Sequence, residues 1–147
     1  MSGAVWHEPV VSRAARWQRL GVCGGTVWLT GLSGSGKSTI GHALDASLTA
    51  GGVPATVLDA DNLRHGLNAD LGFSDDDRTE NVRRTAEVAR LFAEAGTVAI
   101  VPIISPFAAG RDAARAAHAR DGLDFWEVWV STPLDECERR DTKGLYA

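Results

Sequence analysis

Apolar residues along the chain follow two patterns. Short runs of β-branched and apolar residues at 26–30, 55–58, 98–104 and 124–130 predict four strands. Three segments between these runs, 37–48, 77–95 and 107–120, predict helices, and the first two repeat apolar residues at spacings of three and four. Strands that alternate with helices predict an α/β fold with a parallel sheet, which binds its ligands at the carboxyl ends of the strands.

The spacing also predicts which side chains face the core. In the helix at 77–95 these are Val82, Ala86, Ala89 and Phe92, and in the helix at 37–48 they are Ile40, Ala43, Leu44 and Leu48. The run at 98–104 is almost continuously apolar, as expected for a parallel strand that is covered on both faces. Residues 1–24 are polar and aromatic, with one short helix expected near 12–20. We expect them to form an N-terminal arm ahead of one domain at 25–147.

The segment between the first strand and the first long helix matches the Walker A pattern G-x-x-x-x-G-K-[ST] at every fixed position. Its glycines allow positive φ, so that the backbone N–H groups can form an anion nest at a helix N-terminus. A glycine-rich turn that merely caps a helix is the alternative, but it gives no reason for a lysine beside the nest. The segment therefore predicts nucleoside triphosphate binding by Gly31, Leu32, Ser33, Gly34, Ser35, Gly36, Lys37, Ser38 and Thr39.

Three side chains of this loop have distinct expected roles. Lys37 would reach the β- and γ-phosphates and so take part in transfer, and Thr39 would touch the α-phosphate. Ser38 would offer its hydroxyl to Mg²⁺, which prefers oxygen ligands and keeps several of its waters. ATP and Mg²⁺ are thus the expected cofactors.

Composition narrows the choice of partners. The 15 Lys and Arg residues and 19 Asp and Glu residues give a formal net charge of −4, which does not favour a nucleic-acid partner. No apolar run approaches the ~20 residues of a membrane span, and the N-terminus lacks the pattern of a signal peptide, so we expect a cytoplasmic protein without a membrane partner. Two cysteines and four histidines form neither a disulfide framework nor a metal-ligand pair.

Polar residues gather where the predicted strands end. Asp59 and Asp61 follow the second strand, and phosphoryl transfer needs a carboxylate to orient or deprotonate the attacking hydroxyl. Asp61 is the candidate for that carboxylate, and Asp59 is better placed for a Mg²⁺-bound water. The alternative for either residue is N-capping of the turn at Asn62. Nearby arginines could bind a second anion or form a solvated helix face, and the latter is favoured for Arg83 and Arg84.

These residues resemble the adenylylsulfate kinase family. The matching positions are 58–68 (LDADNLRHGLN), 70–74 (DLGFS), 77–78 (DR), 80–84 (ENVRR), 104–106 (ISP), Arg111, 133–134 (PL), 137–138 (CE), 140–141 (RD) and 143–146 (KGLY). The resemblance covers nearly everything from residue 25 onward. It implies a P-loop NTPase fold, a three-layer α/β/α arrangement with a mostly parallel sheet, and a homodimer. It also implies transfer of the γ-phosphate of ATP to the 3′-hydroxyl of adenosine 5′-phosphosulfate (APS), which gives 3′-phosphoadenylyl sulfate for sulfate assimilation.

The resemblance also assigns roles to residues. It makes Asp61 the base at the 3′-hydroxyl and Phe73 the side chain that stacks on the substrate adenine. It places Arg139 with the ATP-binding residues at the start of a mobile lid. Phosphosulfate and the rest of the acceptor would contact Arg64, Arg78, Asn81, Ile104, Ser105, Lys143 and Leu145. In this family, the serine at the position of Ser105 is described as a phosphoserine intermediate, so the resemblance makes Ser105 a catalytic candidate. The lack of an adjacent general base instead favours a structural or substrate-loop role.

Two departures from the family pattern affect these expectations. Ala60 stands where the family usually has glycine, which is tolerable if φ there is negative. The chain stops at Ala147, within the expected lid, so we expect incomplete lid and C-terminal elements, weak substrate affinity and low turnover. A P-loop kinase for another small nucleotide or alcohol, and a nucleotide-binding module without catalysis, are the alternative functions.

Overall fold

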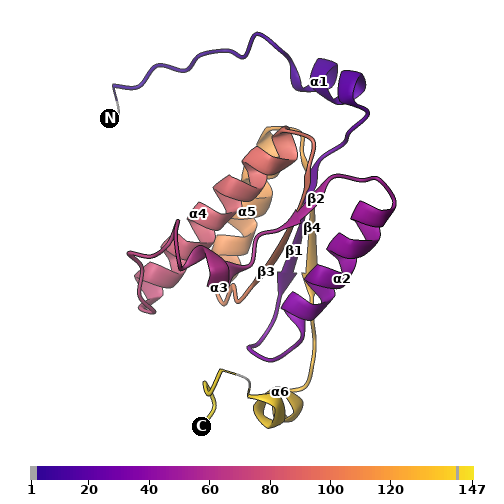
Figure 1. The fold of residues 1–147 in the computed structure, drawn as a ribbon. Coiled ribbons are helices and arrows are strands. Elements are labelled where there is room, and N and C mark those ends of the chain that lie inside the picture. Colours follow the sequence, from indigo (N-terminus) through magenta and orange to yellow (C-terminus); the bar gives the residue numbers. More distant parts are fainter. Residues whose placement is uncertain (1–2, 142) are drawn as a thin grey trace.

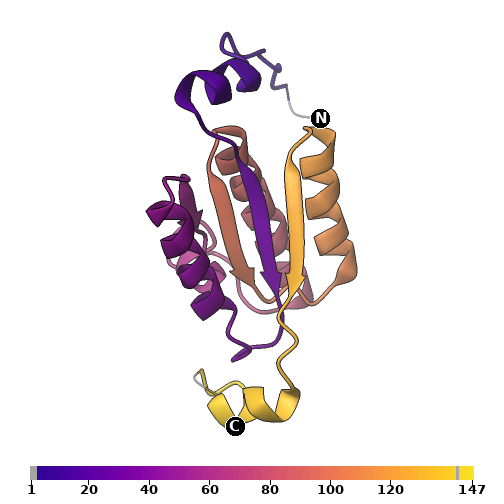
Figure 2. The ribbon, with the colours of Figure 1, turned by 90° about the vertical axis from the view of Figure 1, so that its right-hand side faces the viewer.

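Four parallel strands form the centre of the molecule. The computed structural model describes residues 3–141 and 143–147. The strands are β1 (Gly25–Thr30), β2 (Ala55–Val57), β3 (Val98–Ile103) and β4 (Asp124–Trp129), in the order β2-β3-β1-β4. Gly25 of β1 is level with Val98 of β3 and with Asp124 of β4, so the three strands also end at the same edge. Figure 2 shows this edge beside the C-terminal segment.

Helices cover both faces of the sheet, as Figure 1 shows. Helix α2 (Lys37–Ala50) lies on one face, and α4 (Asp75–Glu94) and α5 (Ala108–Arg120) lie on the other. This confirms the predicted three-layer α/β/α fold with a parallel sheet. Three shorter helices complete the order: α1 (Arg13–Leu20), α3 (Ala60–Leu63) and α6 (Leu134–Arg140). The sequence patterns predict α1 but neither α3 nor α6.

The core lies mainly between the sheet and α4. Strand β3 is buried from Ala99 to Ile103, as its apolar run predicts, and Trp28 of β1 is fully buried. Val82, Ala86 and Ala89 of α4 are buried as predicted, but Phe92 is 39% exposed and Ala93 is buried instead. Spacings of four, three and four bring position 93, not 92, back to the helix face that packs on the sheet.

In helix α2, too, the buried face differs from the predicted face by one residue. Ile40 is 45% exposed and Ala43 is also exposed, so their predicted core positions are wrong. Gly41 is buried against β1 and β3, where a Cβ would meet Ile100 and Leu29 at ordinary van der Waals distances. The face that packs on the sheet therefore runs through Gly41 rather than through Ile40.

The N-terminal region contacts the end of α4 through α1. Ser12 caps this helix, since its hydroxyl accepts from the Ala15 N–H at 3.1 Å. Arg13 forms a 2.9 Å ion pair with Glu94, and the Trp17 indole donates to the Glu94 carbonyl at 3.0 Å. Residues ahead of α1 extend away from the sheet (Figure 1). Of the helices in the described ranges, none has the length and apolar character that a membrane span requires.

A buried histidine joins α5 to β1. His118 is fully buried, with Nδ1 2.8 Å from the Ala114 carbonyl and Nε2 2.8 Å from the Thr26 hydroxyl. A carbonyl can only accept, so Nδ1 carries the hydrogen, and the neutral ring accepts from Thr26 at Nε2. Burial lowers the pKa of His118 below its ordinary value, and the Arg90 cation acts in the same direction.

This burial predicts a loss of stability in acid. The folded-state pKa of His118 lies below the unfolded value, so its neutral form stabilises the fold fully above about pH 6.5. As pH falls from there through the folded pKa, the unfolding free energy should drop by at most about 1.4 kcal/mol per pH unit from this group. Chemical denaturation between pH 7.5 and 5 measures that slope.

Two variants control for the other titrating groups. His118→Gln removes the titration and should flatten the slope, whereas His7→Gln, at an exposed position of the N-terminal region, should keep it. Equal slopes for the wild type and His118→Gln would contradict the assignment.

Candidate active site

The loop between β1 and α2 has the backbone geometry that its glycines predict. Gly31, Gly34 and Gly36 have φ values of 155°, 77° and 100°. Helix α2 begins directly after Gly36, so its N-terminal N–H groups face the loop. A Cβ on Gly31 would lie 2.7 Å from the Val130 carbonyl oxygen, which leaves no room for a side chain. The segment 31–39 is therefore a formed phosphate-binding loop.

Lys37 is the cation of this loop. Only 9% of the residue is exposed, and Nζ donates to the Leu32 carbonyl at 2.7 Å. Burial, followed by repulsion from Lys143, lowers the pKa of Lys37 to about 8. An anion in the loop would offset both effects, so the site favours a negatively charged ligand.

The segment after β4 holds the carbonyl groups of the same loop. Three donors reach three consecutive carbonyls: Thr132 Oγ1 to Ser35 at 2.7 Å, Arg140 Nη1 to Gly34 at 3.1 Å, and the Tyr146 hydroxyl to Ser33 at 2.9 Å. These bonds fix the loop from its outer side and leave ligand binding to its N–H groups. The sequence patterns do not reveal them, because the partners are about a hundred residues apart along the chain.

Asp59 links the loop to the end of β2. Its Oδ2 accepts from the Ser38 hydroxyl at 2.7 Å, and its Oδ1 accepts from the Asp61 N–H at 2.9 Å as the N-cap of α3. The N-capping interpretation of this aspartate is therefore confirmed, and its other carboxylate oxygen lies beside the hydroxyl that is expected to bind Mg²⁺. Ala60 follows within α3, outside the positive-φ region, so its side chain is tolerated in the glycine position.

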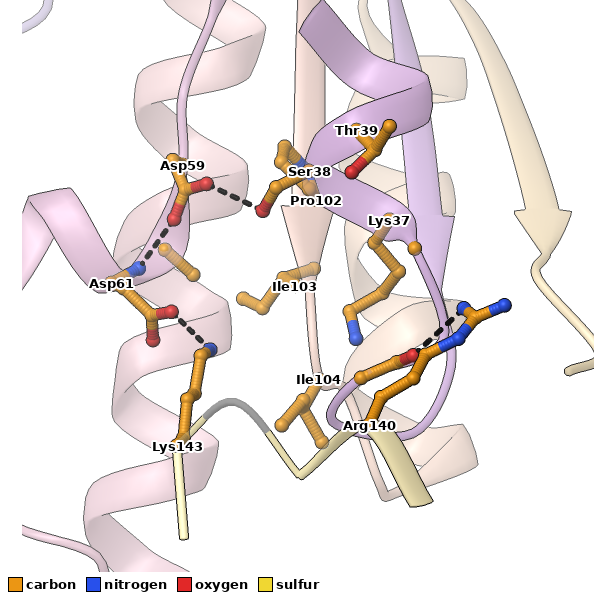
Figure 3. Close-up of a pocket in the computed structure, with 13 residues that line it drawn as sticks. Lys37, Ser38, Thr39, Asp59, Asp61, Pro102, Ile103, Ile104, Arg140 and Lys143 are labelled. Carbon is orange, nitrogen blue, oxygen red and sulfur yellow. Dashed lines mark hydrogen bonds and ion pairs between the residues drawn. The ribbon is translucent and has the colours of Figure 1, made fainter. Parts of the chain in front are cut away.

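A cavity of about 290 Å³ opens over the loop (Figure 3). Ser38 and Asp59 supply hard oxygen atoms to its wall, the kind of ligand that Mg²⁺ prefers. Within 3–141 and 143–147, no three His, Cys, Asp or Glu side chains are grouped to hold a metal, so a cation here would also need phosphate or water oxygens. The lining residues are Gly34, Gly36, Lys37, Ser38, Thr39, Asp59, Ala60, Asp61, Pro102, Ile103, Ile104, Arg140 and Lys143.

A second cavity, of about 370 Å³, adjoins the first. Eight residues expected to contact an acceptor line it together: Asp61, Arg64, Phe73, Arg78, Asn81, Ile104, Lys143 and Leu145. The two cavities share Ala60, Asp61, Ile103, Ile104 and Lys143. Asp61 and Lys143 form an ion pair at this junction. A carboxylate thus lies where a group in one cavity would meet a group in the other.

Two arginines hold the aromatic ring of the second cavity. The guanidinium carbon of Arg64 lies 4.3 Å from the Phe73 ring centre, and that of Arg78 lies 6.0 Å from it. Arg64 also donates to the Gly72 carbonyl at 2.9 Å, and Arg78 Nε donates to the Phe73 carbonyl at 2.9 Å. Phe73 remains 69% exposed, so most of its ring is available for stacking on a planar ligand.

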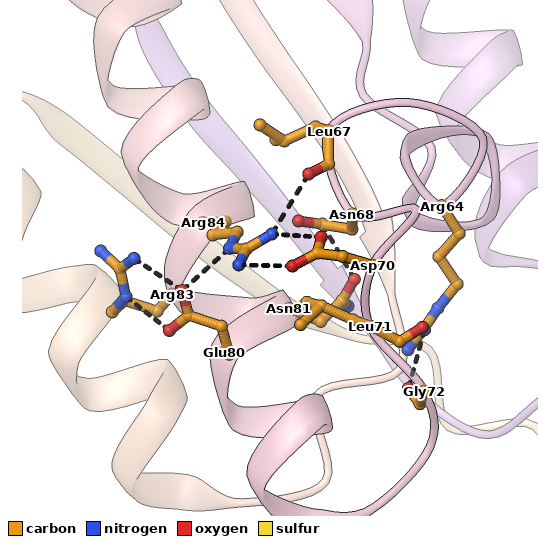
Figure 4. Close-up of polar contacts among 10 residues, drawn as sticks. All are labelled: Arg64, Leu67, Asn68, Asp70, Leu71, Gly72, Glu80, Asn81, Arg83 and Arg84. Atoms are coloured by element: carbon orange, nitrogen blue, oxygen red, sulfur yellow. Dashed lines mark hydrogen bonds and ion pairs between the residues drawn. The ribbon is translucent and has the colours of Figure 1, made fainter.

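Asn81 is fixed by a second asparagine that sequence reasoning missed. Its Oδ1 accepts from Asn68 Nδ2 at 3.0 Å, which leaves the Asn81 NH₂ group as the donor for a ligand (Figure 4). Asn68 is fully buried. Position 68 belongs to the quoted family run, but nothing in its local pattern distinguishes a buried support from a loop residue.

The neighbouring arginines Arg83 and Arg84 have structural partners. Both donate to Glu80 and together lower the pKa of its carboxyl group to about 2. Arg84 also bridges to Asp70 at 2.7 Å, which ties α4 to the loop that carries Arg64 (Figure 4). Their engagement agrees with the expectation that these two arginines do not serve the ligand.

Two other expected site residues lie apart from these cavities. Ser105 lines a different cavity, with Arg111 and Glu127, and its hydroxyl accepts from the Trp28 indole at 3.1 Å and donates to Thr30 at 2.8 Å. Arg139 extends from α6 toward Glu136, with 73% of its side chain exposed. Its neighbour Arg140 is the α6 arginine that lines the first cavity.

Comparison with known proteins agrees with this geometry. The adenylylsulphate kinase family model matches residues 23–147. The probable adenylyl-sulfate kinase of Halalkalibacterium halodurans is 55% identical over 142 residues, which are 97% of this chain and 67% of the relative. The adenylyl-sulfate kinase of Clostridium acetobutylicum is 49% identical over 145 residues, which are 99% of this chain and 71% of the relative.

A longer relative and a solved structure extend the comparison. The bifunctional enzyme CysN/CysC of Mycobacterium tuberculosis is 59% identical over 97% of this chain, which spans 23% of that protein. The structure of the M. tuberculosis APS kinase CysC in complex with AMPPNP and APS matches with a TM-score of 0.82 and 58% identity, over 85% of this chain and 72% of that one. The match to the family model and these relatives show that the chain belongs to the adenylylsulfate kinase family.

Proposed function

We propose that the chain is an ATP-dependent adenylyl-sulfate kinase, which transfers the γ-phosphate of ATP to the 3′-hydroxyl of APS. The observation that carries the proposal is the junction of two cavities at Asp61, one with the phosphate-binding loop and the other with Arg64, Phe73 and Arg78. A phosphoryl donor and an acceptor that occupy these cavities would meet beside a carboxylate. Membership of the family and the similarity to an APS kinase solved with AMPPNP and APS support this choice of substrates.

The donor side would act by position and charge. The N–H groups of the loop and Lys37 would hold the phosphates, with Thr39 toward the α-phosphate. Mg²⁺, bound to the Ser38 hydroxyl and through water to Asp59, would neutralise charge on the β- and γ-phosphates. Arg140 lies at the cavity wall and would add a second cation near the loop.

The acceptor side would orient the 3′-hydroxyl. Phe73 would stack on the adenine, and Arg64, Arg78 and Asn81 would hold the phosphosulfate through guanidinium and amide donors. Asp61 would accept the hydroxyl proton while the oxygen bonds to the γ-phosphorus. The bond from that phosphorus to the β–γ bridging oxygen would break, and ADP would leave with the electron pair. Lys143 pairs with Oδ2 of Asp61, so Oδ1 would take the proton and the Lys143 ammonium would lie near the transferred phosphoryl group.

The finer features of the enzyme are proposals as well. We propose a homodimer, which the family resemblance implies, and sedimentation would distinguish it from a hexamer such as the APS kinase of Thiobacillus denitrificans. We also propose a cytoplasmic location, because ATP is an intracellular substrate. The N-terminal region before residue 25 would lie outside the kinase domain proper.

The proposed reaction can be tested by measuring ADP release from Mg-ATP by the purified chain. APS should stimulate release and AMP should not, because AMP lacks the sulfate that Arg64 and Arg78 would bind. Lys37→Ala should abolish the stimulated release and weaken ATP binding. Asp61→Asn should keep ATP binding but lower kcat by a factor of about 10² to 10⁴, the usual contribution of a general base.

Three outcomes would count against this proposal. Stimulation by AMP as strong as by APS would indicate another nucleotide kinase. ATP binding without stimulation in a folded protein would indicate a binding module. Full activity in Asp61→Asn would remove Asp61 from the role of base.

The second prediction separates the two cavities. Arg78→Ala should raise KM for APS by about 10- to 100-fold, as expected for the loss of a hydrogen bond between charged groups, while KM for ATP stays within about twofold. Arg83→Ala, five residues further along α4 and paired with Glu80, is the matched control and should leave both constants unchanged. A loss of ATP affinity alone in Arg78→Ala would reverse the assignment of donor and acceptor cavities.

A further inference from the structure

Residues 104–107, the segment between β3 and α5, have no regular secondary structure. Ile104 belongs to the wall of each cavity. Ser105 follows it and is 3% exposed, with its hydroxyl held between Trp28 and Thr30 of β1. Pro106 comes next and has no N–H to donate. The position of Ile104 therefore depends on contacts made by the residue beside it.

Arg111 of α5 also contacts Ser105. Its Nη1 donates to the Ser105 carbonyl, so the peptide group between Ser105 and Pro106 is held in addition to the Ser105 hydroxyl. Its Nε pairs with Glu127 of β4 at 2.8 Å, and the side chains of both are about three-quarters buried. The carboxylate thus fixes the guanidinium, and the guanidinium fixes the backbone beside Ile104.

Arg115 provides an internal comparison for Arg111. It lies one turn further along α5 and also pairs with Glu127. Its guanidinium lies 5.3 Å from the Phe125 ring centre rather than at the loop. The two arginines therefore share one carboxylate and one helix, but of the two only Arg111 donates to the backbone of 104–107.

We propose that Arg111, oriented by Glu127, is a positioning residue for the acceptor nucleotide. This inference rests on the proposed function. Arg111 holds the Ser105 carbonyl, and thereby keeps Ile104, which forms part of the acceptor cavity wall, in the geometry that binds the acceptor. ATP binding depends less on Arg111, because separate hydrogen bonds from Thr132, Arg140 and Tyr146 support the phosphate-binding loop. Loosening 104–107 therefore weakens acceptor binding more than donor binding.

The test uses the complete chain and three variants, Arg111→Met, Arg115→Met and Glu127→Gln. Calorimetry with Mg-ADP bound gives Kd for APS, and a separate titration gives Kd for Mg-ADP. Arg111→Met should weaken APS binding about tenfold, with Mg-ADP binding within about twofold, since a hydrogen bond to a charged group is lost. Glu127→Gln should weaken APS binding in the same direction but less, and Arg115→Met should leave both constants unchanged.

Two further readouts separate positioning from general destabilisation. Arg111→Met and Arg115→Met both lose an ion pair to Glu127, so their denaturation midpoints should fall by similar amounts. Backbone amide exchange in the peptide that spans 103–108 should accelerate in Arg111→Met and not in Arg115→Met.

The outcomes separate this inference from the function on which it rests. Equal APS affinities in Arg111→Met and Arg115→Met, or equal losses for both ligands, would overturn the positioning role while the kinase assignment stands. A wild-type chain that binds Mg-ADP but not APS would overturn the proposed function itself, and the inference with it.

Discussion

The parallel pairing of β3 with both β1 and β2 is the constraint on which the site depends. Because Gly25, Ala55 and Val98 are level, these strands run together toward one edge of the sheet. The phosphate-binding loop leaves β1, the Asp59–Asp61 turn leaves β2, and the 104–107 segment leaves β3. Hydrogen bonds between strands thus bring together three segments that are far apart in sequence. No side chain of the site has to create that proximity.

The local backbone explains why much of the site could be predicted from the sequence. The positive φ angles at Gly34 and Gly36 are properties that only a few residue types allow, so a pattern of residues specifies the loop geometry. The acceptor residues were assigned by resemblance, and the structure lines a single cavity with eight of them. The grouping of five of them, Asp61, Arg64, Phe73, Arg78 and Asn81, is predictable because they come from runs that follow β2 and begin α4, whereas Ile104 follows β3 and Lys143 and Leu145 follow α6.

Other features depend on distant contacts that no local pattern encodes. The bond from the Tyr146 hydroxyl to the Ser33 carbonyl joins residues 113 positions apart, and that from Thr132 to Ser35 spans 97. The sequence around Asn68 does not distinguish it from other loop asparagines, and only its hydrogen bond to Asn81 in the structure shows its role. The errors at Ile40 and Phe92 are of another kind. A helical period fixes a face only to about one position, and packing against the sheet decides which neighbour is buried.

The position of Ser105 also bears on how the phosphoryl group would move. Its hydroxyl is committed at both ends, as an acceptor from Trp28 and a donor to Thr30, and neither partner is a base that could remove its proton. Asp61, by contrast, lies on the wall shared by the donor and acceptor cavities. A transfer through Ser105 would need the group to leave this junction and return to it. In-line transfer beside Asp61 needs neither step, so the geometry favours a single direct displacement, with Ser105 as a support of the wall that Arg111 holds in place.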